Sequence, residues 1–296
     1  ISQWPDNRVF EAIRASQADI LLDLTGLTSG GRPNVVAKRP LDINISQWGF
    51  LNTAGTGIYD FITTDPWIWP PDGHTVMAEK PIMHPCGLLS CCELEHRSPQ
   101  TRHKRQWGFK DTDIVIGAFH NAYKITPLWL ASWLKLLAEY PNCHLWLYAP
   151  TTETRDNLCA WITQTKSDVL PRVHFAAPLP LLEHQARLQA CDFFADTFGY
   201  NAGATAVGAI AAGLPILTMP GRTMLSRMGF AINQSLGFDE LCQTTPSDYF
   251  ALAEQWLSNT AQLKEVQVRL VEARERRRWG DVAAWTDEWL SLVRKL

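Results

Sequence analysis

From about residue 111 onward, apolar and polar positions follow each other in blocks that predict a regular succession of strands and helices. Short apolar runs of a few residues are typical of strands buried in a parallel sheet, and longer segments with apolar residues three or four positions apart are typical of helices. We expect strands at 114–118, 144–148, 172–175, 193–195 and 216–218, and helices at 127–138, 153–165 and 181–190. Such β-α repetition predicts a parallel sheet with right-handed crossovers.

The pattern before this region is less complete. We expect a helix at 6–17, strands at 20–24, 43–48 and 61–64, and two glycine-containing loops at 25–31 and 49–57. Five prolines predict a mostly extended or turning chain over 65–92, and a polar, basic stretch at 93–110 is typical of a linker. The sequence therefore predicts a partial N-terminal half-domain at 1–96, a linker at 97–110 and a Rossmann-like domain at 111–296. The last of these ends in helices at 246–258, 261–277 and 281–295.

Composition narrows the class of protein. The 296 residues suffice for two α/β domains, and 46% hydrophobic with 19% charged residues is ordinary for a soluble protein. We expect no membrane span, because no apolar run approaches the roughly 18 residues needed. The net charge of −3 does not indicate nucleic-acid binding, and we interpret the basic runs 102–105 and 274–278 as solvated faces. Seven cysteines without CxxC spacing predict reduced thiols in a cytoplasmic protein, without a zinc site.

The segment 192–222 has the pattern of an anion-binding site: strand, polar turn, small-residue helix, strand and a second glycine turn. Asn201 is a plausible N-cap for the helix. Ala202, Gly203, Ala204 and Thr205 add little bulk over its first turn, so backbone N–H groups there can approach a phosphate closely. The same small residues also suit tight packing of a helix on a sheet. The segment alone leaves both interpretations open.

Other candidates follow neighbouring strands, where the ligands of parallel sheets lie. The segment 119–124 comes directly after the strand 114–118, and its Lys124 is suited to neutralise a departing diphosphate or, alternatively, to lie solvated in a loop. His184 begins a helix and either stacks on a base or lies on the surface. The turn at 221–227 is a second junction, whose arginines are more often structural. The sequence contains no metal-ligand cluster, GxSxG elbow or P-loop.

In order along the chain, these segments resemble the catalytic region of the O-linked N-acetylglucosamine transferase family, which are peptide glycosyltransferases with a GT-B fold. The resemblance rests on five segments spanning nearly the whole chain: 19–33, 49–60, 119–124, 196–201 and 217–227. It implies an α/β protein of two Rossmann-like domains, the first incomplete here. It also implies that a UDP-sugar is held mainly by the second domain, as a substrate, with no cofactor and no metal.

The resemblance also assigns roles to residues. Lys124 matches the family lysine that contacts the donor phosphates and is the expected catalytic residue. Asn121 matches a residue of the same pocket, His184 the histidine beside the uracil, and Thr205 one phosphate-binding threonine. The donor site implied in this way comprises Asn121, His184, Asn201, Ala202, Gly203, Ala204 and Thr205.

The chain departs from the family pattern at several positions. Gly203 and Ala204 stand where the family has a histidine and a first threonine, and Gly208 stands where an aspartate holds the ribose. Leu51 replaces a proline in the glycine-rich loop. The family's catalytic region also begins earlier, after a helical repeat array, so this chain matches its later part. A charge-assisted contact to sugar hydroxyls contributes about 1.5 to 3 kcal/mol, so losing the aspartate weakens donor binding by an order of magnitude or more.

We expect transfer of N-acetylglucosamine, or another hexose, from a UDP-sugar to Ser, Thr or Asn side chains of a protein. The amides of 202–205 and Lys124 stabilise the UDP leaving group in this hypothesis. Residues expected on the acceptor side are Gly26, Arg32, Asn52 and Thr53. One alternative is a non-catalytic or truncated relative that keeps the fold and weak nucleotide binding. Another is a different GT-B enzyme, such as a sugar-nucleotide epimerase or a small-molecule glycosyltransferase. The expected partners are the UDP-sugar donor and a protein or peptide acceptor.

Overall fold

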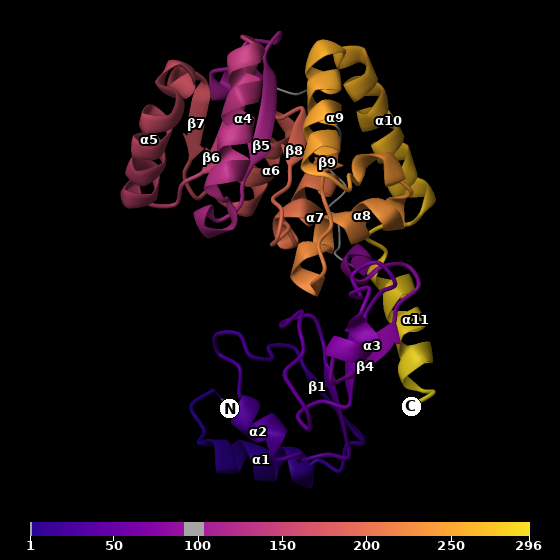
Figure 1. Ribbon diagram of the computed structural model, residues 1–296. Coiled ribbons are helices and arrows are strands. Elements are labelled where there is room, and N and C mark those ends of the chain that lie inside the picture. The colour runs from indigo at the N-terminus through magenta and orange to yellow at the C-terminus, as the bar shows by residue number, and fades with distance from the viewer. Residues whose placement is uncertain (1, 92–103) are drawn as a thin grey trace. The chain divides into compact units, whose positions relative to one another are not determined.

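The computed structural model describes residues 2–91 and 104–296, and the chain divides into two compact units (Figure 1). The first unit comprises Ile1–Leu88, Arg222–Leu225 and Ala283–Leu296, and the second comprises Leu89–Gly221 and Ser226–Val282. Both units are α/β structures with wholly parallel sheets. The fold class expected from the sequence is therefore confirmed.

The first unit is built on a four-stranded sheet whose strands follow the chain, β1-β2-β3-β4. The strands are β1 Ile20–Asp23, β2 Ile43–Ser46, β3 Phe61–Thr64 and β4 Lys80–Met83. The helices are α1 Asp6–Ala15, α2 Pro33–Ala37, α3 Gly73–Val76 and α11 Val282–Val293, with a 3-10 turn at Leu88–Cys91. Strand β4 and helix α3 lie in the stretch 65–92, which we expected to be mostly extended or turning. Because β4 is an edge strand, it tolerates Pro81, the residue that hides it in the sequence.

The C-terminal helix α11 packs within the first unit through its two tryptophans. The Trp285 ring stacks on His84 with centroids 4.3 Å apart, and its Nε1 donates to the Gly87 carbonyl at 3.0 Å. Trp289, one turn later, donates to Thr63 Oγ1 at 3.1 Å. The compact units thus differ from the expected bounds 1–96, 97–110 and 111–296 at this helix. The different functions expected for those three ranges stay a prediction.

The second unit has a five-stranded sheet in the order β7-β6-β5-β8-β9. Its strands are β5 Ile114–Ala118, β6 Cys143–Tyr148, β7 Val173–Ala176, β8 Phe193–Ala195 and β9 Ile216–Leu217. This is the doubly wound order in which the chain reverses direction across the sheet between β5 and β8. The strands agree with the expected ones to within a residue. A crevice for ligands is expected at this reversal, beyond the carboxyl ends of β5 and β8.

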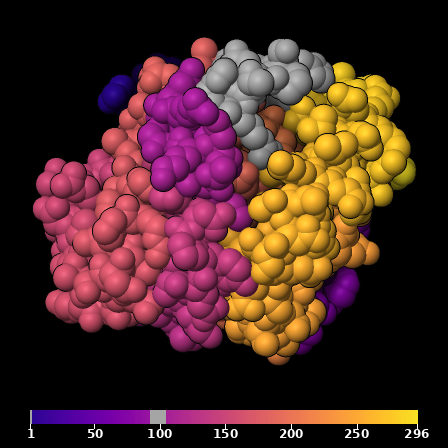
Figure 2. Space-filling model, turned by 90° about the horizontal axis from the view of Figure 1, so that it is seen from above, coloured from indigo at the N-terminus to yellow at the C-terminus, as the bar shows by residue number. Residues whose placement is uncertain are grey.

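Helices cover both faces of this sheet. They are α4 Pro127–Glu139, α5 Thr152–Lys166, α6 Leu181–Gln189, α7 Ala204–Ala211, α8 Met228–Leu236, α9 Pro246–Ser258 and α10 Thr260–Arg276. In Figure 1, α4 lies on one face and α6 on the other, as right-handed crossovers require when the chain reverses direction. Figure 2 shows the gold surface of the C-terminal helices beside the magenta part of the chain that includes α4.

The core of the second unit holds the end of β8 in place. Trp129 of α4 and Tyr249 of α9 are buried, and both donate to the carbonyl oxygen of Asp196 at 3.1 Å. Thr126 caps α4 by accepting from the Trp129 amide, and Pro127 occupies the first helical position. The loop that follows β8 therefore starts from a rigid point.

The two basic runs were expected to be solvated, and this is wrong for Lys104. Arg102 and His103 lie outside the described residues. Lys104 is buried, and its Nζ donates to the Asp192 carboxylate at 2.6 Å and to the Asp113 carbonyl at 2.5 Å. In the second run, the half-buried Arg274 donates to two carbonyls at the end of α7. Some basic residues of these runs thus make buried hydrogen bonds to carbonyl and carboxylate oxygens. The pattern of charges alone does not reveal which residues do so.

Candidate functional site

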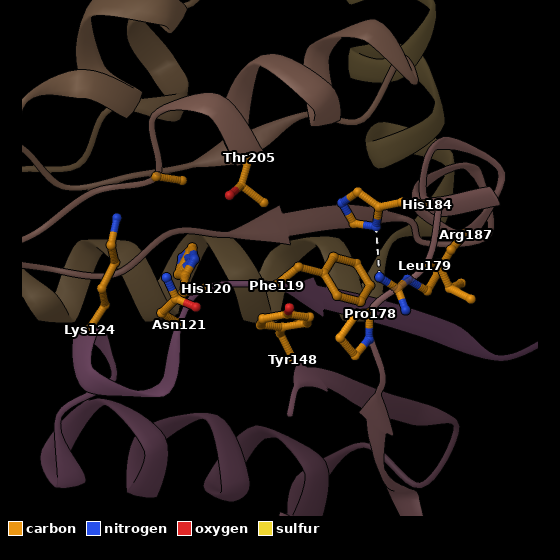
Figure 3. Close-up of a pocket in the computed structure, with 11 residues that line it drawn as sticks. Phe119, His120, Asn121, Lys124, Tyr148, Pro178, Leu179, His184, Arg187 and Thr205 are labelled. Atoms are coloured by element: carbon orange, nitrogen blue, oxygen red, sulfur yellow. Dashed lines mark hydrogen bonds between the residues drawn. The ribbon is translucent and has the colours of Figure 1, made fainter. Parts of the chain in front are cut away.

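A cavity of about 290 Å³ opens at the carboxyl ends of the strands of the second unit (Figure 3). Its residues come from the segments after β5, β7 and β8, from the end of β6 and from helix α6. They are Phe119, His120, Asn121, Lys124, Tyr148, Pro178, Leu179, His184, Arg187, Ala202 and Thr205. The cavity therefore lies at the reversal of strand order, where the topology places a ligand site.

One end of the cavity is cationic. Lys124 ends a 3-10 turn, Ala122–Lys124, directly after β5. Its Nζ donates to the Asn201 carbonyl at 3.0 Å and lies 3.6 Å from the centre of the Tyr200 ring. Burial lowers the pKa of Lys124, and the nearby Asp196 opposes this shift. The ammonium is thus held by one carbonyl and one aromatic face, both of which an anion can displace.

Helix α7 points its N-terminus toward the same end. Its first i to i−4 hydrogen bond runs from the Val207 amide to the Gly203 carbonyl, at 3.0 Å. The amides of Ala204, Thr205 and Ala206 therefore belong to the first turn, where a helix leaves its N–H groups without intrahelical partners. Figure 3 shows the Thr205 hydroxyl directed into the cavity. These groups complement the Lys124 charge in favouring an anion.

Two residues expected in the donor site also hold the loop that follows β8 together. Asn201 is not the N-cap, because the cap position falls on Gly203 and has no side-chain hydrogen bond. The Asn201 side chain is fully buried and donates to the Thr197 carbonyl at 2.6 Å. The Ala202 amide donates to Asp196 Oδ1 at 2.8 Å, so it is already engaged. Of the expected residues 201–205, the amides at 204 and 205 and the Thr205 hydroxyl remain suited to an anion.

Asp196, which the sequence did not single out, organises this loop. Its Oδ1 also accepts from the Thr197 amide at 2.9 Å, and its Oδ2 accepts from Thr218 Oγ1 at 2.7 Å. Burial raises the pKa of Asp196 to about 7. His120 Nε2 lies 3.5 Å from the carboxylate, and burial together with Lys124 lowers the pKa of His120 to about 3. In the sequence, the position of Asp196 directly after an apolar strand was the feature that could have indicated this role.

The other end of the cavity is aromatic and apolar. Phe119, Tyr148, Pro178 and Leu179 lie there, and the His184 ring meets Phe119 edge to face with centroids 5.5 Å apart. His184 is half-buried, so the alternative of a surface histidine is not what the structure shows. Its Nδ1 lies 2.8 Å from Arg187 Nη2. Burial, reinforced by Arg187, lowers the pKa of His184 to about 4.

Sequence reasoning missed Tyr148 and Arg187, because neither stands in a recognisable motif. Tyr148 is the last residue of β6, a position at the ligand edge of the sheet. Arg187 lies three residues after His184, which places both on the same side of α6. These positions in the sequence could have indicated that Tyr148 and Arg187 line the cavity.

The residues expected on the acceptor side belong to the first unit. The loops after β1 and β2 lie against each other, since a Cβ added at Gly26 would come within 2.5 Å of Phe50 Cβ. Gly26 also has a φ of +58°, which favours glycine. Asn52 is exposed, and Thr53 Oγ1 accepts from the Gly55 amide at 3.1 Å. The structure therefore brings Gly26 close to the loop that carries Asn52 and Thr53.

Arg32 lies near these loops but points its guanidinium at the start of the chain. It donates to the Trp4 carbonyl at 2.8 Å, to the Ser2 carbonyl at 2.6 Å and to Asp6 Oδ1 at 3.1 Å. These contacts fix the segment before α1 against the start of α2. Arg32 therefore holds local structure in addition to any role toward an acceptor.

Among residues 2–91 and 104–296, no three His, Cys, Asp or Glu side chains come together as a metal site. Within the same ranges, no helix is both long and apolar enough to cross a bilayer. The described cysteines are free thiols, and Cys91, Cys143 and Cys191 are buried.

Two α/β units with parallel sheets, one of them with a cationic and aromatic cavity at its strand ends, are typical of the GT-B class of glycosyltransferase folds. The chain belongs to glycosyl transferase family 41, whose family profile matches residues 89–289. The recognition of the O-linked N-acetylglucosamine transferase family from the sequence is thereby confirmed.

Among curated relatives, a probable UDP-N-acetylglucosamine–peptide N-acetylglucosaminyltransferase, SPINDLY of Eustoma exaltatum, is 27% identical over 276 residues, covering 90% of this chain and 29% of its own length. The corresponding SEC protein of Arabidopsis thaliana is 25% identical over 244 residues, covering 80% of this chain and 25% of its own length. The chain thus spans less than a third of the length of these relatives.

Solved structures show the same fold. The O-GlcNAc transferase of Thermobaculum terrenum, in a mutant form, superposes with a TM-score of 0.84 at 22% identity, over 99% of this chain and 57% of that one. HepE of Anabaena in complex with UDP gives a TM-score of 0.66 at 12% identity, over 98% and 82% of the respective chains. At these identities the likeness establishes the fold.

Proposed function

We propose that this chain is the later part of the catalytic region of a UDP-sugar-dependent protein glycosyltransferase. It transfers N-acetylglucosamine or another hexose to Ser, Thr or Asn side chains. The observation that carries the proposal is the pairing, within one cavity, of a cationic end at Lys124 with an aromatic end at His184 (Figure 3). A nucleoside diphosphate has the matching anionic and planar parts. The names of the curated relatives and the UDP bound to HepE support the same ligand class.

The groups at the cationic end suit the departure of UDP. During transfer, the acceptor oxygen bonds to the anomeric carbon while the bond from that carbon to the diphosphate breaks, so negative charge grows on the leaving phosphate. Lys124 Nζ, the amides of Ala204 and Thr205, and the Thr205 hydroxyl are fixed donors for this charge. Asn121, exposed beside Lys124, adds an amide side chain to the same wall.

On the acceptor side, we propose that the loop surfaces carrying Gly26, Asn52 and Thr53 receive the protein substrate. Asn52 offers an exposed amide, and the close contact of Gly26 with Phe50 keeps the two loops together. Arg32 acts in this proposal by bracing the loop after β1 through its bonds to residues 2–6. Its direct contact with an acceptor is not needed.

A second candidate is a relative that binds nucleotide without turnover. Gly203, Ala204 and Gly208 favour it, because they leave the first turns of α7 without the side chains that the family places there. At Gly203, a Cβ would lie 2.9 Å from Met228 Sδ, so Met228 fills the space that a larger side chain would need. The cavity therefore holds the donor mainly through Lys124, backbone amides and the aromatic end.

Calorimetric titration of UDP at matched pH and salt tests the donor site. We expect binding that weakens by about 10- to 150-fold in Lys124→Ala and in Lys124→Met, since one charge-assisted hydrogen bond contributes about 1.5 to 3 kcal/mol. Lys135→Ala is the matched control, because Lys135 is an exposed lysine of α4 outside the cavity.

The outcomes separate the candidates. Absence of UDP binding by the folded chain, or equal affinity in Lys124→Ala and Lys135→Ala, overturns the donor-site assignment. UDP binding that depends on Lys124, together with no sugar release or transfer from UDP-N-acetylglucosamine or UDP-glucose to peptides, favours the non-catalytic candidate.

A further inference from the structure

A second cavity of about 480 Å³ lies around β7, the edge strand of the five-stranded sheet (Figure 1). We call it the edge cavity; its walls are largely aromatic, with Trp107, Phe109, Trp146 and His174 among them. Trp146 is 6% exposed, and its ring meets Trp107 and Phe109 with centroids 5.3 and 5.1 Å apart. The edge cavity shares no lining residue with the cavity at Lys124, so it is a separate site.

His174 belongs to a chain of three polar side chains, of which it is the member that lines the edge cavity. His174 Nε2 lies 3.0 Å from His144 Nδ1, and His144 Nε2 lies 3.4 Å from Asp113 Oδ2. The same carboxylate oxygen accepts from the Lys110 amide at 2.8 Å. Phe109 meets both imidazoles edge to face, with centroids 5.5 and 4.7 Å apart. These contacts hold the two rings in one orientation.

The carboxylate decides the direction of the hydrogen bonds in this chain. Burial lowers the pKa of both histidines, that of His174 to about 4, so both rings are neutral near pH 7. A neutral imidazole has one donor and one acceptor nitrogen, whereas a carboxylate only accepts. His144 therefore directs Nε2–H toward Asp113 and keeps its lone pair on Nδ1. His174 then donates from Nε2, which leaves its own lone pair on Nδ1.

This lone pair is available to a ligand. Nδ1 of His174 has no hydrogen-bond partner in the described part of the chain, and it is not a fully buried atom. Arg155, an exposed residue of α5, lines the same cavity. Its contact with Asp156, at 3.8 Å between two exposed side chains, is a weak ion pair that leaves the guanidinium free to meet another anion. The edge cavity thus combines aromatic walls, an acceptor and a cation.

We propose that the edge cavity binds a planar aromatic acid that carries an N–H or O–H donor on its ring. The ring packs among the aromatic walls, the donor bonds to His174 Nδ1, and the acid group meets Arg155. Asp113 and His144 are positioning residues, because they keep the lone pair of His174 on Nδ1. The proposal does not depend on the proposed function, since no residue of the cavity at Lys124 takes part.

Nitrogen-15 NMR of the histidine side chains tests the direction of the chain without ligand. His174→Phe and His144→Phe identify the two sets of resonances. We expect Nε2–H with an unprotonated Nδ1 for both rings in wild type, and a mixture of tautomers at His174 in Asp113→Ala. Asp156→Ala, which removes an exposed carboxylate of α5, is the control. A proton on His174 Nδ1 in wild type overturns the proposed acceptor, and an unchanged tautomer in Asp113→Ala overturns the positioning role of Asp113.

Binding is tested at pH 7 with indole-3-acetate and benzofuran-3-acetate, two planar acids of which only the first has a ring N–H. We expect wild type to bind indole-3-acetate about 3- to 10-fold more tightly, with shifts at His174, because one neutral hydrogen bond separates the two probes. His174→Phe keeps an aromatic wall without the lone pair and should bind both probes equally. Arg155→Met should weaken both by about two- to fivefold, the effect of an exposed ion pair. Arg276→Met is the control, because Arg276 is an exposed arginine of α10 outside the edge cavity.

Several results would overturn the site. One is equal affinity of the two probes for wild type, and another is a preference for the N–H probe that persists in His174→Phe. Binding that leaves the resonances of His174 unchanged places the probes elsewhere on the protein. Absence of binding of both probes by the folded chain also overturns the proposal.

Discussion

Gly208→Asp is expected to strengthen the binding of UDP. Gly208 lies on α7 one turn after Thr205, so the two residues share a face of the helix. In the family that the chain resembles, an aspartate at this position holds the ribose. A Cβ added at Gly208 would lie 3.4 Å from Leu188 Cδ1, a contact that the end of a leucine side chain can accommodate. The Cβ of the new residue therefore fits without a shift of the backbone.

The size of the gain follows from the two hydrogen bonds that a carboxylate accepts from vicinal ribose hydroxyls. Charge-assisted hydrogen bonds contribute about 1.5 to 3 kcal/mol, which corresponds to roughly 10- to 150-fold in affinity. Repulsion between the new carboxylate and the diphosphate reduces this gain. The favourable helix-end effect is small, because Gly208 lies beyond the first turn of α7. We therefore expect about a tenfold increase.

Titration calorimetry with two ligands separates the carboxylate effect from other causes. Gly208→Ala adds the Cβ alone, and Gly208→Asn adds a neutral side chain of the same shape. The gain should appear with UDP in Gly208→Asp and disappear with the 2′,3′-dideoxy form of UDP, which lacks the ribose hydroxyls. If Gly208→Asp and Gly208→Ala bind UDP equally well, or if the gain persists with the dideoxy ligand, the ribose does not lie along this face of α7.

Two further predictions concern stability. Lys104→Met removes the ammonium that donates to the half-buried Asp192 carboxylate, so we expect a loss of about 3 kcal/mol in the free energy of unfolding. The double variant with Asp192→Asn should lose less than the sum of the single changes, and hydrogen exchange of the Val115 amide, which donates to Asp192, reports both. Burial lowers the pKa of His120 to about 3 in the folded chain, so between about pH 3 and pH 6.5 the unfolded chain binds one more proton than the folded chain. The contribution of His120 to the free energy of unfolding is therefore full above pH 6.5 and falls as the pH drops toward 3. His120→Asn should remove about 1.4 kcal/mol per pH unit from that slope, measured by urea unfolding.

Much of the second unit could be predicted from its pattern, because its strands are buried on both faces and therefore read as continuous apolar runs. Strands β5 and β8 begin and end where the sequence predicts. Since ligands of parallel sheets lie beyond the carboxyl ends, Lys124 and Thr205 could be placed near one another from the strand positions alone. The structure brings both to the same cavity.

The residues that were missed or misplaced depend on contacts distant in the sequence. Lys104 is buried because Asp192, far along the chain, lies beside it. Arg187 lines the cavity from the last turn of α6, where the local pattern is that of any amphipathic helix. The C-terminal helix belongs to the first unit because Trp285 and Trp289 donate hydrogen bonds to groups of that unit. A charge run or a helical periodicity does not specify which distant group will be its neighbour.

Asn201 was expected to cap α7, and its actual contacts show how the loop after β8 is held together. The sequence indicates a cap and a row of free amides, yet Asp196 takes the Ala202 amide and Thr197 takes the Asn201 side chain. These internal bonds make the loop rigid and leave the Asn201 carbonyl as the partner of Lys124. In the proposed function, a phosphate that enters the cavity therefore competes with that carbonyl for the ammonium, and the amides of α7 compensate for the contact that is lost. Because Gly203 and Ala204 add no side-chain donors, the net affinity depends on how firmly the aromatic end holds the base.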